Sequence, residues 1–360
     1  MSRKHFSLLL GVTLAVALLV LLVPGKTGRE SDVEKSRLLP GLQEQVNQLD
    51  WLRIAGPGGE TVVTLNRGED YWRVDELYGY PADWEQLKSL LTDLTQAEIV
   101  ELKTDNPDYY GRLGVADVSQ SDADGVLIEF QEASGLPALI VGNRAQGRDG
   151  HYVRLKDAAQ SVLIDRSLEL PRERMSWLEK EIIHVPDSEV VEVELAHADG
   201  ERVVARKASA DDEDFALQDI PEGREIQSAW SVNSLANGLA SLTLDAVVPV
   251  ADVDWSGAGR FGLITADGLR VDADLVALEP TADDDSGETG YWMRLQAGLY
   301  QTALESGVNQ PEEGAADPAE RAEAINQRVS GWAYRIPKYK YDAMTKRMGD
   351  LLKAPDASDT

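Results

Sequence analysis

The order of apolar segments and turns in this chain occurs twice. Gly59 and Gly200 stand in equivalent turns 141 residues apart, and Tyr152 and Tyr291 stand in equivalent apolar segments 139 residues apart. An offset that stays nearly constant over roughly a hundred residues is typical of an internal duplication. The chain is therefore expected to fold as two tandem copies of one unit.

Both copies are expected to be rich in antiparallel strands. Residues 51–54 and 61–65 alternate apolar and polar side chains around a glycine-rich turn, and residues 191–195 and 202–205 do the same. This pattern predicts a β-hairpin at the start of each copy. Short apolar segments then follow in the same order, at residues 98–100, 126–130, 138–142 and 151–155 and at residues 246–248, 261–264, 269–273 and 290–295.

Each copy also contains one predicted main helix. In the first copy Asp83 is suited to cap the helix, with Gln86 completing a capping box. In the second copy Ser228 is the expected cap. Apolar side chains recur at helical spacing after each cap, at Trp84, Leu87, Leu90, Leu91 and Leu94 and at Val232, Leu235, Leu239 and Leu242. One helix covered on one side by antiparallel strands defines the α+β class.

These patterns predict the domain boundaries. The first α+β repeat is expected at residues 40–180 and the second at residues 186–352. The second repeat contains an insert that the first lacks, with a helix at about residues 311–328. A last helix is expected from Tyr341 to Leu352, and residues 353–360 are expected to form a tail.

The N-terminal part of the chain predicts a membrane anchor. Residues 6–23 form an 18-residue stretch without a charged side chain, which as a helix spans about 27 Å. Arg3 and Lys4 precede it, so the positive-inside rule places the N-terminal residues 1–5 in the cytoplasm. Residues 24–39 then form a stalk outside that membrane. The alternative is a cleavable signal peptide, whose apolar region is usually shorter and ends in a small-residue cleavage site.

Composition and motifs exclude several kinds of chemistry. Asp and Glu number 63 against 35 Lys and Arg, and this net charge of −28 argues against binding to nucleic acid. The absence of cysteine excludes disulfides and thiolate metal sites. The histidines stand singly, and the glycines of residues 257–262 precede a strand rather than a helix. We therefore expect no catalytic, cofactor-binding or metal-binding residue, although the acidic residues 283–288 leave ion binding open.

The insert of the second copy is the predicted contact for a partner protein. It occurs in one copy only, so the shared fold does not need it. Ile325 and Val329 are spaced one helical turn apart and would form a small apolar stripe on its helix. The alternative is that these two side chains hold the insert against its own domain.

Short motifs in a fixed order add a family resemblance. They include Leu38-Leu39-Pro40-Gly41-Leu42, Gly79-Tyr80-Pro81, Asn106-Pro107 and Tyr110-Gly111-Arg112-Leu113-Gly114-Val115. Together with the N-terminal apolar stretch, their order resembles the family known as domain of unknown function 4340, from about residue 1 to at least residue 250. The resemblance implies a single-pass protein of the bacterial inner membrane with a periplasmic body. It also implies two partners, an ABC-type permease and an auxiliary membrane protein of the gliding-motility type.

Two functional hypotheses follow from the sequence. The first is a non-enzymatic accessory subunit of an ABC-type export system that acts through its extracytoplasmic surface. The alternative is an extracytoplasmic ligand-binding or hydrolytic domain with a site between the two repeats, since clefts between domains are common ligand sites. A convergent set of polar catalytic groups would favour the alternative.

The anchor is directly testable. Intact protein should stay in the membrane fraction through a high-salt or carbonate wash, because burial of the apolar helix in lipid, rather than charge, retains it. A reporter fused after Arg37 should behave as extracytoplasmic. Recovery of a mature form that starts near Gly25 would contradict the prediction.

Overall fold

The computed structural model describes residues 36–280, 287–300 and 317–354. The predicted anchor and the cytoplasmic tail lie outside these residues. Every helix within the described ranges is too short or too polar to cross a bilayer.

The first sheet has ten strands. In sheet order they run β1-β6-β10-β9-β8-β7-β2-β3-β4-β5. Their bounds in chain order are β1 (Ser36–Arg37), β2 (Trp51–Ala55), β3 (Thr61–Arg67), β4 (Trp72–Val74), β5 (Tyr80–Pro81), β6 (Glu98–Leu102), β7 (Val126–Phe130), β8 (Leu139–Arg144), β9 (His151–Leu155) and β10 (Ser161–Ile164).

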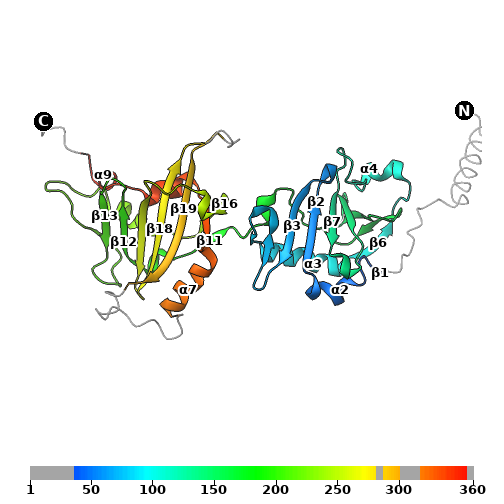
Figure 1. Ribbon diagram of the computed structural model, residues 1–360, viewed down its shortest axis with the longest axis horizontal. Coiled ribbons are helices and arrows are strands. Elements are labelled where there is room, and N and C mark those ends of the chain that lie inside the picture. The colour runs from blue at the N-terminus through cyan, green and yellow to red at the C-terminus, as the bar shows by residue number, and fades with distance from the viewer. Residues whose placement is uncertain (1–35, 281–286, 301–316, 355–360) are drawn as a thin grey trace, which may run out of the picture. The chain divides into compact units, whose positions relative to one another are not determined.

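The second sheet has eight strands, in the order β14-β13-β12-β17-β18-β19-β20-β16. Their bounds are β12 (Val190–Ala196), β13 (Arg202–Arg206), β14 (Ala216–Leu217), β16 (Ala246–Pro249), β17 (Gly259–Thr265), β18 (Leu269–Leu278), β19 (Gly290–Leu299) and β20 (Trp332–Arg335). Figure 1 shows β12, β13, β18 and β19 in this sheet, with helix α7 (Pro318–Val329) beside β19. A separate small sheet pairs β11 (Glu181–Ile183) with β15 (Leu242–Thr243).

The two large sheets share one strand order. The run β6-β10-β9-β8-β7-β2-β3-β4 in the first corresponds strand for strand to β16-β20-β19-β18-β17-β12-β13-β14 in the second. Six of these eight pairs, all except β10 with β20 and β4 with β14, consist of segments that the sequence analysis equates. The α+β class is confirmed, because strand-rich sheets are combined with few helices.

Helix α3 (Trp84–Gln96) is the predicted main helix of the first copy. Its cap is present, since the amide of Gln86 donates to Oδ1 of Asp83 over 3.0 Å. Leu87, Leu90, Leu91 and Leu94 are buried as predicted, but the side chain of Trp84 is 49% exposed. Helical side chains tilt toward the N-terminus, so the side chain of the first residue projects beyond the buried stripe.

The prediction of a main helix in the second copy is correct for about one turn and wrong beyond it. Helix α5 (Ala229–Asn233) ends early and continues only as a 3₁₀ turn over Ser234–Asn237, while Leu242 lies in β15. The cap is correct, because Ser228 accepts from the amide of Ser231. Serine and asparagine favour turns over helix interiors. A Cβ on the next residue, Gly238, would lie 2.6 Å from the ring of Phe261, so the chain approaches the sheet too closely for a larger residue.

Two other boundaries differ from the prediction. Of the expected stalk at 24–39, the structure describes residues 36–39, where Ser36–Arg37 forms β1 and the leucines 38 and 39 are buried. The expected last helix is broken into α8 (Lys338–Met344) and α9 (Met348–Leu351). The break occurs because Asp350 caps a new helix by accepting from the amide of Arg347 over 2.8 Å.

By their internal contacts the residues divide into two units. Among the described residues, one unit holds residues 36–62 with Lys88–Leu170, and the other holds Val63–Leu87 with those from Pro171 onward. In the second unit, Asp83 N–H donates to the Trp177 carbonyl over 2.8 Å, and Glu179 N–H donates to the Pro81 carbonyl over 3.1 Å. The boundary near residue 180 that the repeat predicts stays a prediction.

The buried stripe of α3 can be tested by Leu91→Asp, which places a carboxylate at a position only 6% exposed. We expect the free energy of unfolding to fall by about 3 kcal/mol, because the charge has no partner in the core. Urea unfolding followed by circular dichroism measures the change. Ser89→Asp, on the exposed face of the same helix, is the control and should change stability by less than about 0.5 kcal/mol. Equal effects of both variants would contradict this packing.

Candidate functional site

Charged side chains gather on one face of the second sheet. Alternate residues of a strand point to the same face, so the paired registers of β13, β12, β17, β18 and β19 align them across the sheet. We call this set the charged ladder, and it consists of Glu192, Glu194, Arg202, Arg206, Arg260, Arg270, Asp272, Asp274 and Arg294.

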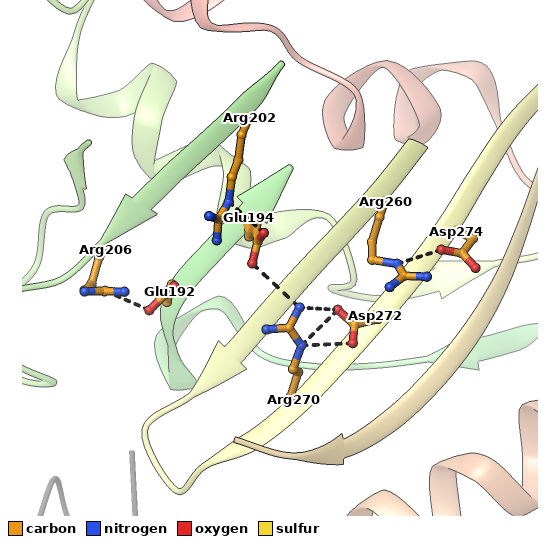
Figure 2. Close-up of polar contacts among 8 residues, drawn as sticks. All are labelled: Glu192, Glu194, Arg202, Arg206, Arg260, Arg270, Asp272 and Asp274. Atoms are coloured by element: carbon orange, nitrogen blue, oxygen red, sulfur yellow. Dashed lines mark hydrogen bonds and ion pairs between the residues drawn. The ribbon is translucent and has the colours of Figure 1, made fainter. Parts of the chain in front are cut away.

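Three arginines of the ladder each pair closely with one carboxylate (Figure 2). Arg206 Nε lies 2.7 Å from Glu192 Oε2, and Arg202 Nε lies 2.8 Å from Glu194 Oε1. Arg270 is bidentate on Asp272, with Nε donating over 2.9 Å and Nη2 over 2.7 Å. Such bidentate pairs fix both the position and the plane of the guanidinium.

Gly262 makes room for the Arg270–Asp272 pair. It stands opposite Asp272 on the neighbouring strand, on the same face of the sheet. A Cβ there would lie 2.7 Å from Asp272 Oδ1 and 3.2 Å from Arg270 Nη2. A larger residue would therefore push the ion pair out of its position.

Asp274 is held closely by two arginines, whereas Arg270 approaches Glu194, the partner of Arg202, only to 3.7 Å. Arg260 Nε donates to its Oδ1 over 2.8 Å, and Arg294 Nε donates to its Oδ2 over 2.9 Å. Burial raises the pKa of Asp274, but the two arginine hydrogen bonds outweigh burial and hold its pKa below the ordinary value. The Arg294 guanidinium also lies 4.8 Å from the centre of the Trp255 ring, which holds its plane in place.

A cavity of about 510 Å³ opens at this end of the ladder. The sheet contributes Arg260, Asp272, Asp274, Arg294 and Gln296 to its lining. The opposite side comes from the end of α7 and the start of β20, including Val329, Ser330 and Trp332. Its volume falls in the range of small-molecule sites.

Helix α7 covers the free edge of β19. The strand β20 pairs with β19 only at Trp292 and Met293, which leaves the rest of that edge open. Asn326 closes it at Ala297, where the side-chain Oδ1 accepts from the backbone amide over 2.8 Å and Nδ2 donates to the carbonyl over 2.9 Å. The amide side chain thus replaces a neighbouring strand.

The predicted partner contact on this helix is only partly at the surface. Val329 is 2% exposed, and Ile325 is half-buried. Arg321 adds ion pairs of 2.7 Å to Glu189 and to Asp267 of the same unit. Burial of Val329 is consistent with the alternative that it holds the helix against its own domain, and a partner contact through Ile325 and Val329 stays a prediction.

The remaining candidates carry no assembled site. Residues 281–286, most of the acidic segment considered for ion binding, lie outside the described residues. Among the residues that the structure does describe, no three metal-ligating side chains come together. His151 is buried and its Nδ1 accepts from the amide of Leu168 over 3.0 Å, while burial lowers its pKa.

Sequence reasoning missed the charged ladder, although its signal was present. Residues 192 and 194, and residues 270, 272 and 274, carry charges at every second position within predicted strands. The same alternation predicts the hairpins. Opposite charges at a spacing of two in consecutive strands would have predicted cross-strand ion pairs.

Comparison with known proteins gives one match. A family model described as "Domain of unknown function (DUF4340)" matches residues 72–258, just over half of the chain. The matched range begins after the predicted anchor and ends before Arg260. No curated protein and no solved structure matches the chain.

The role of Asp274 can be tested through pH. Asp274→Asn should lower the free energy of unfolding by about 1–2 kcal/mol near neutral pH, because two arginines lose their shared charge. Since its folded pKa lies below the ordinary 3.8, the carboxylate stabilises the fold above that pH and loses this effect as the pH falls through the folded pKa.

Urea unfolding at about pH 7 and about pH 3 measures the difference between the variant and the natural protein. The difference should shrink at the lower pH. Asp211→Asn, in an exposed loop, is the control and should leave stability unchanged at both values. A difference for Asp274→Asn that stays constant with pH would contradict this role.

Proposed function

We propose that this chain, which belongs to the DUF4340 family, is a non-enzymatic accessory subunit of an ABC-type export system. Residues 6–23 anchor it in the bacterial inner membrane, and its two sheets act on the periplasmic side. Its partners are the permease and an auxiliary membrane protein of the gliding-motility type.

The observation that supports this proposal is the charged ladder. Its charges are held in pairs across a broad, solvent-accessible sheet face, and Arg202 and Arg206 remain 62% and 54% exposed. A fixed pattern of charge gives a surface specificity for a complementary partner and speeds association. The partner surface that fits this face carries acidic groups opposite the exposed arginines.

The charge balance of the ladder strengthens the proposal. Five arginines face four carboxylates here, whereas the whole chain has a net charge of −28. An acidic partner would be repelled by most of the chain, and this face offers it a local attraction. We therefore assign partner recognition to the ladder.

Charge reversal on the ladder tests the proposal. Tagged full-length protein carrying Arg202→Glu and Arg206→Glu should recover at least about tenfold less permease from solubilised membranes, because like charges at an interface cost several kcal/mol. Quantitative mass spectrometry of the co-purified permease and auxiliary protein measures the loss.

The control is Lys338→Glu with Lys353→Glu. These lysines also sit in exposed ion pairs of the second unit, with Asp342 and Glu225, and the charge change is the same. The control should recover as much permease as the natural protein. Equal recovery with the ladder variant would contradict recognition through this face, and recovery of no permease by the natural protein would contradict the export function.

A further inference from the structure

We infer that the cavity at the end of the charged ladder binds a small organic carboxylate, a monoanion attached to an apolar group. The inference is independent of the proposed function, because the cavity lies within one unit and its ligand need not come from the export partner.

Charge counting locates the binding group. Arg202, Arg206 and Arg270 each have a different nearest carboxylate at 2.7–2.8 Å, and Arg270 has a second one, Glu194, at 3.7 Å. Arg260 and Arg294 share the single carboxylate of Asp274. The surplus positive charge of the ladder therefore falls at the cavity, and one negative charge on a ligand would balance it.

Hydrogen-bond donors remain for that ligand. Arg260 uses Nε on Asp274, and within the described residues neither of its Nη nitrogens has a hydrogen-bond partner. Arg294 places Nε and Nη2 on Asp274, and no other described residue hydrogen-bonds to its Nη1. Guanidinium N–H groups bind carboxylates in a planar, bidentate geometry.

The rest of the lining selects the kind of anion. Asp272 and Asp274 also line the cavity, so a phosphate dianion would meet two carboxylates with only one surplus positive charge to offset them. Trp332, Val250 and Val329 supply apolar surface beside the arginines. Stacking of Arg294 on Trp255 fixes one donor before the ligand arrives, which reduces the entropy lost on binding.

The rival explanation is that the two arginines serve only to join strands. Asp274 bridges β17 and β19 through Arg260 and Arg294, and this bridge would exist without any ligand. In that case an added carboxylate compound would not bind in the cavity. Binding of a defined probe separates the two explanations.

Isothermal titration of the full-length protein in detergent with phenylacetate is the test. We expect a Kd between about 10 µM and 1 mM, which is ordinary for a ligand of this size. Phenylacetamide has the same shape without the charge and should show no binding. Inorganic phosphate should bind more weakly than phenylacetate.

Variants assign the binding to the cavity. Arg260→Gln should weaken phenylacetate binding at least about tenfold, and Arg202→Gln, which removes a ladder arginine outside the cavity lining, should leave it unchanged. Arg260→Lys keeps the positive charge but lacks the planar N–H donors of the guanidinium, and it should weaken binding several-fold. Because it retains the charge, this variant separates a loss of binding from a folding defect in Arg260→Gln. Absence of phenylacetate binding, equal binding of the amide, tighter binding of phosphate, or equal losses in Arg260→Gln and Arg202→Gln would each overturn the inference.

The outcomes are distinguishable from those of the partner test. Loss of permease recovery in the Arg202→Glu, Arg206→Glu variant with intact phenylacetate binding would support both proposals. Unchanged permease recovery with phenylacetate binding that depends on Arg260 would overturn the partner surface alone.

Discussion

Cross-strand pairing of arginine with carboxylate lets the second sheet keep one face open to water. The side chains of each strand alternate, so Val193, Leu263 and Val271 on the other face are buried while their neighbours in sequence form the ladder. Charged side chains on neighbouring strands would repel one another if like charges lay directly opposite each other. In the observed registers unlike charges lie opposite each other, Arg260 opposite Asp274 and Glu192 opposite Arg206. Individual exposed pairs contribute little to stability, but as a set they fix a charge pattern.

The first sheet uses a related arrangement with fewer residues. Glu129 accepts from Arg53 Nε over 2.8 Å and from Lys156 Nζ over 2.9 Å, so one carboxylate again lies between two cations. These hydrogen bonds outweigh burial, which alone would raise the pKa of Glu129, and its pKa is lowered. A carboxylate between two cations is thus a feature of both sheets.

Sequence predicted the strands well because alternation and turn residues are local signals. The apolar spacing of residues 228–242 predicts a helix, but this prediction is wrong because other residues oppose it. Ser231 and Ser234 favour turns, and Gly238 allows close contact with Phe261. The strand Ser36–Arg37 and the burial of Leu38 and Leu39 after it were missed because the sequence shows no partner for so short a strand, and β6 supplies that partner from far along the chain. The cavity could not be predicted either, since its lining comes from β17, β18, β19, α7 and β20, and their convergence depends on tertiary packing.

The cavity depends on what distinguishes the second sheet from the first. Strands β18 and β19 have ten residues each, whereas their counterparts β8 and β9 have six and five. β20 pairs with only two residues of the longer β19, so the extra length needs another cover, and α7 provides it through Asn326. A helix cannot lie as close to a strand as another strand does, because its side chains keep the backbones about 10 Å apart rather than about 5 Å. The space that remains beside Arg294 and Gln296 is the cavity. The inserted helix that protects the sheet edge therefore also creates the cavity. In the first sheet β9 pairs with β10 directly, without an inserted helix between them.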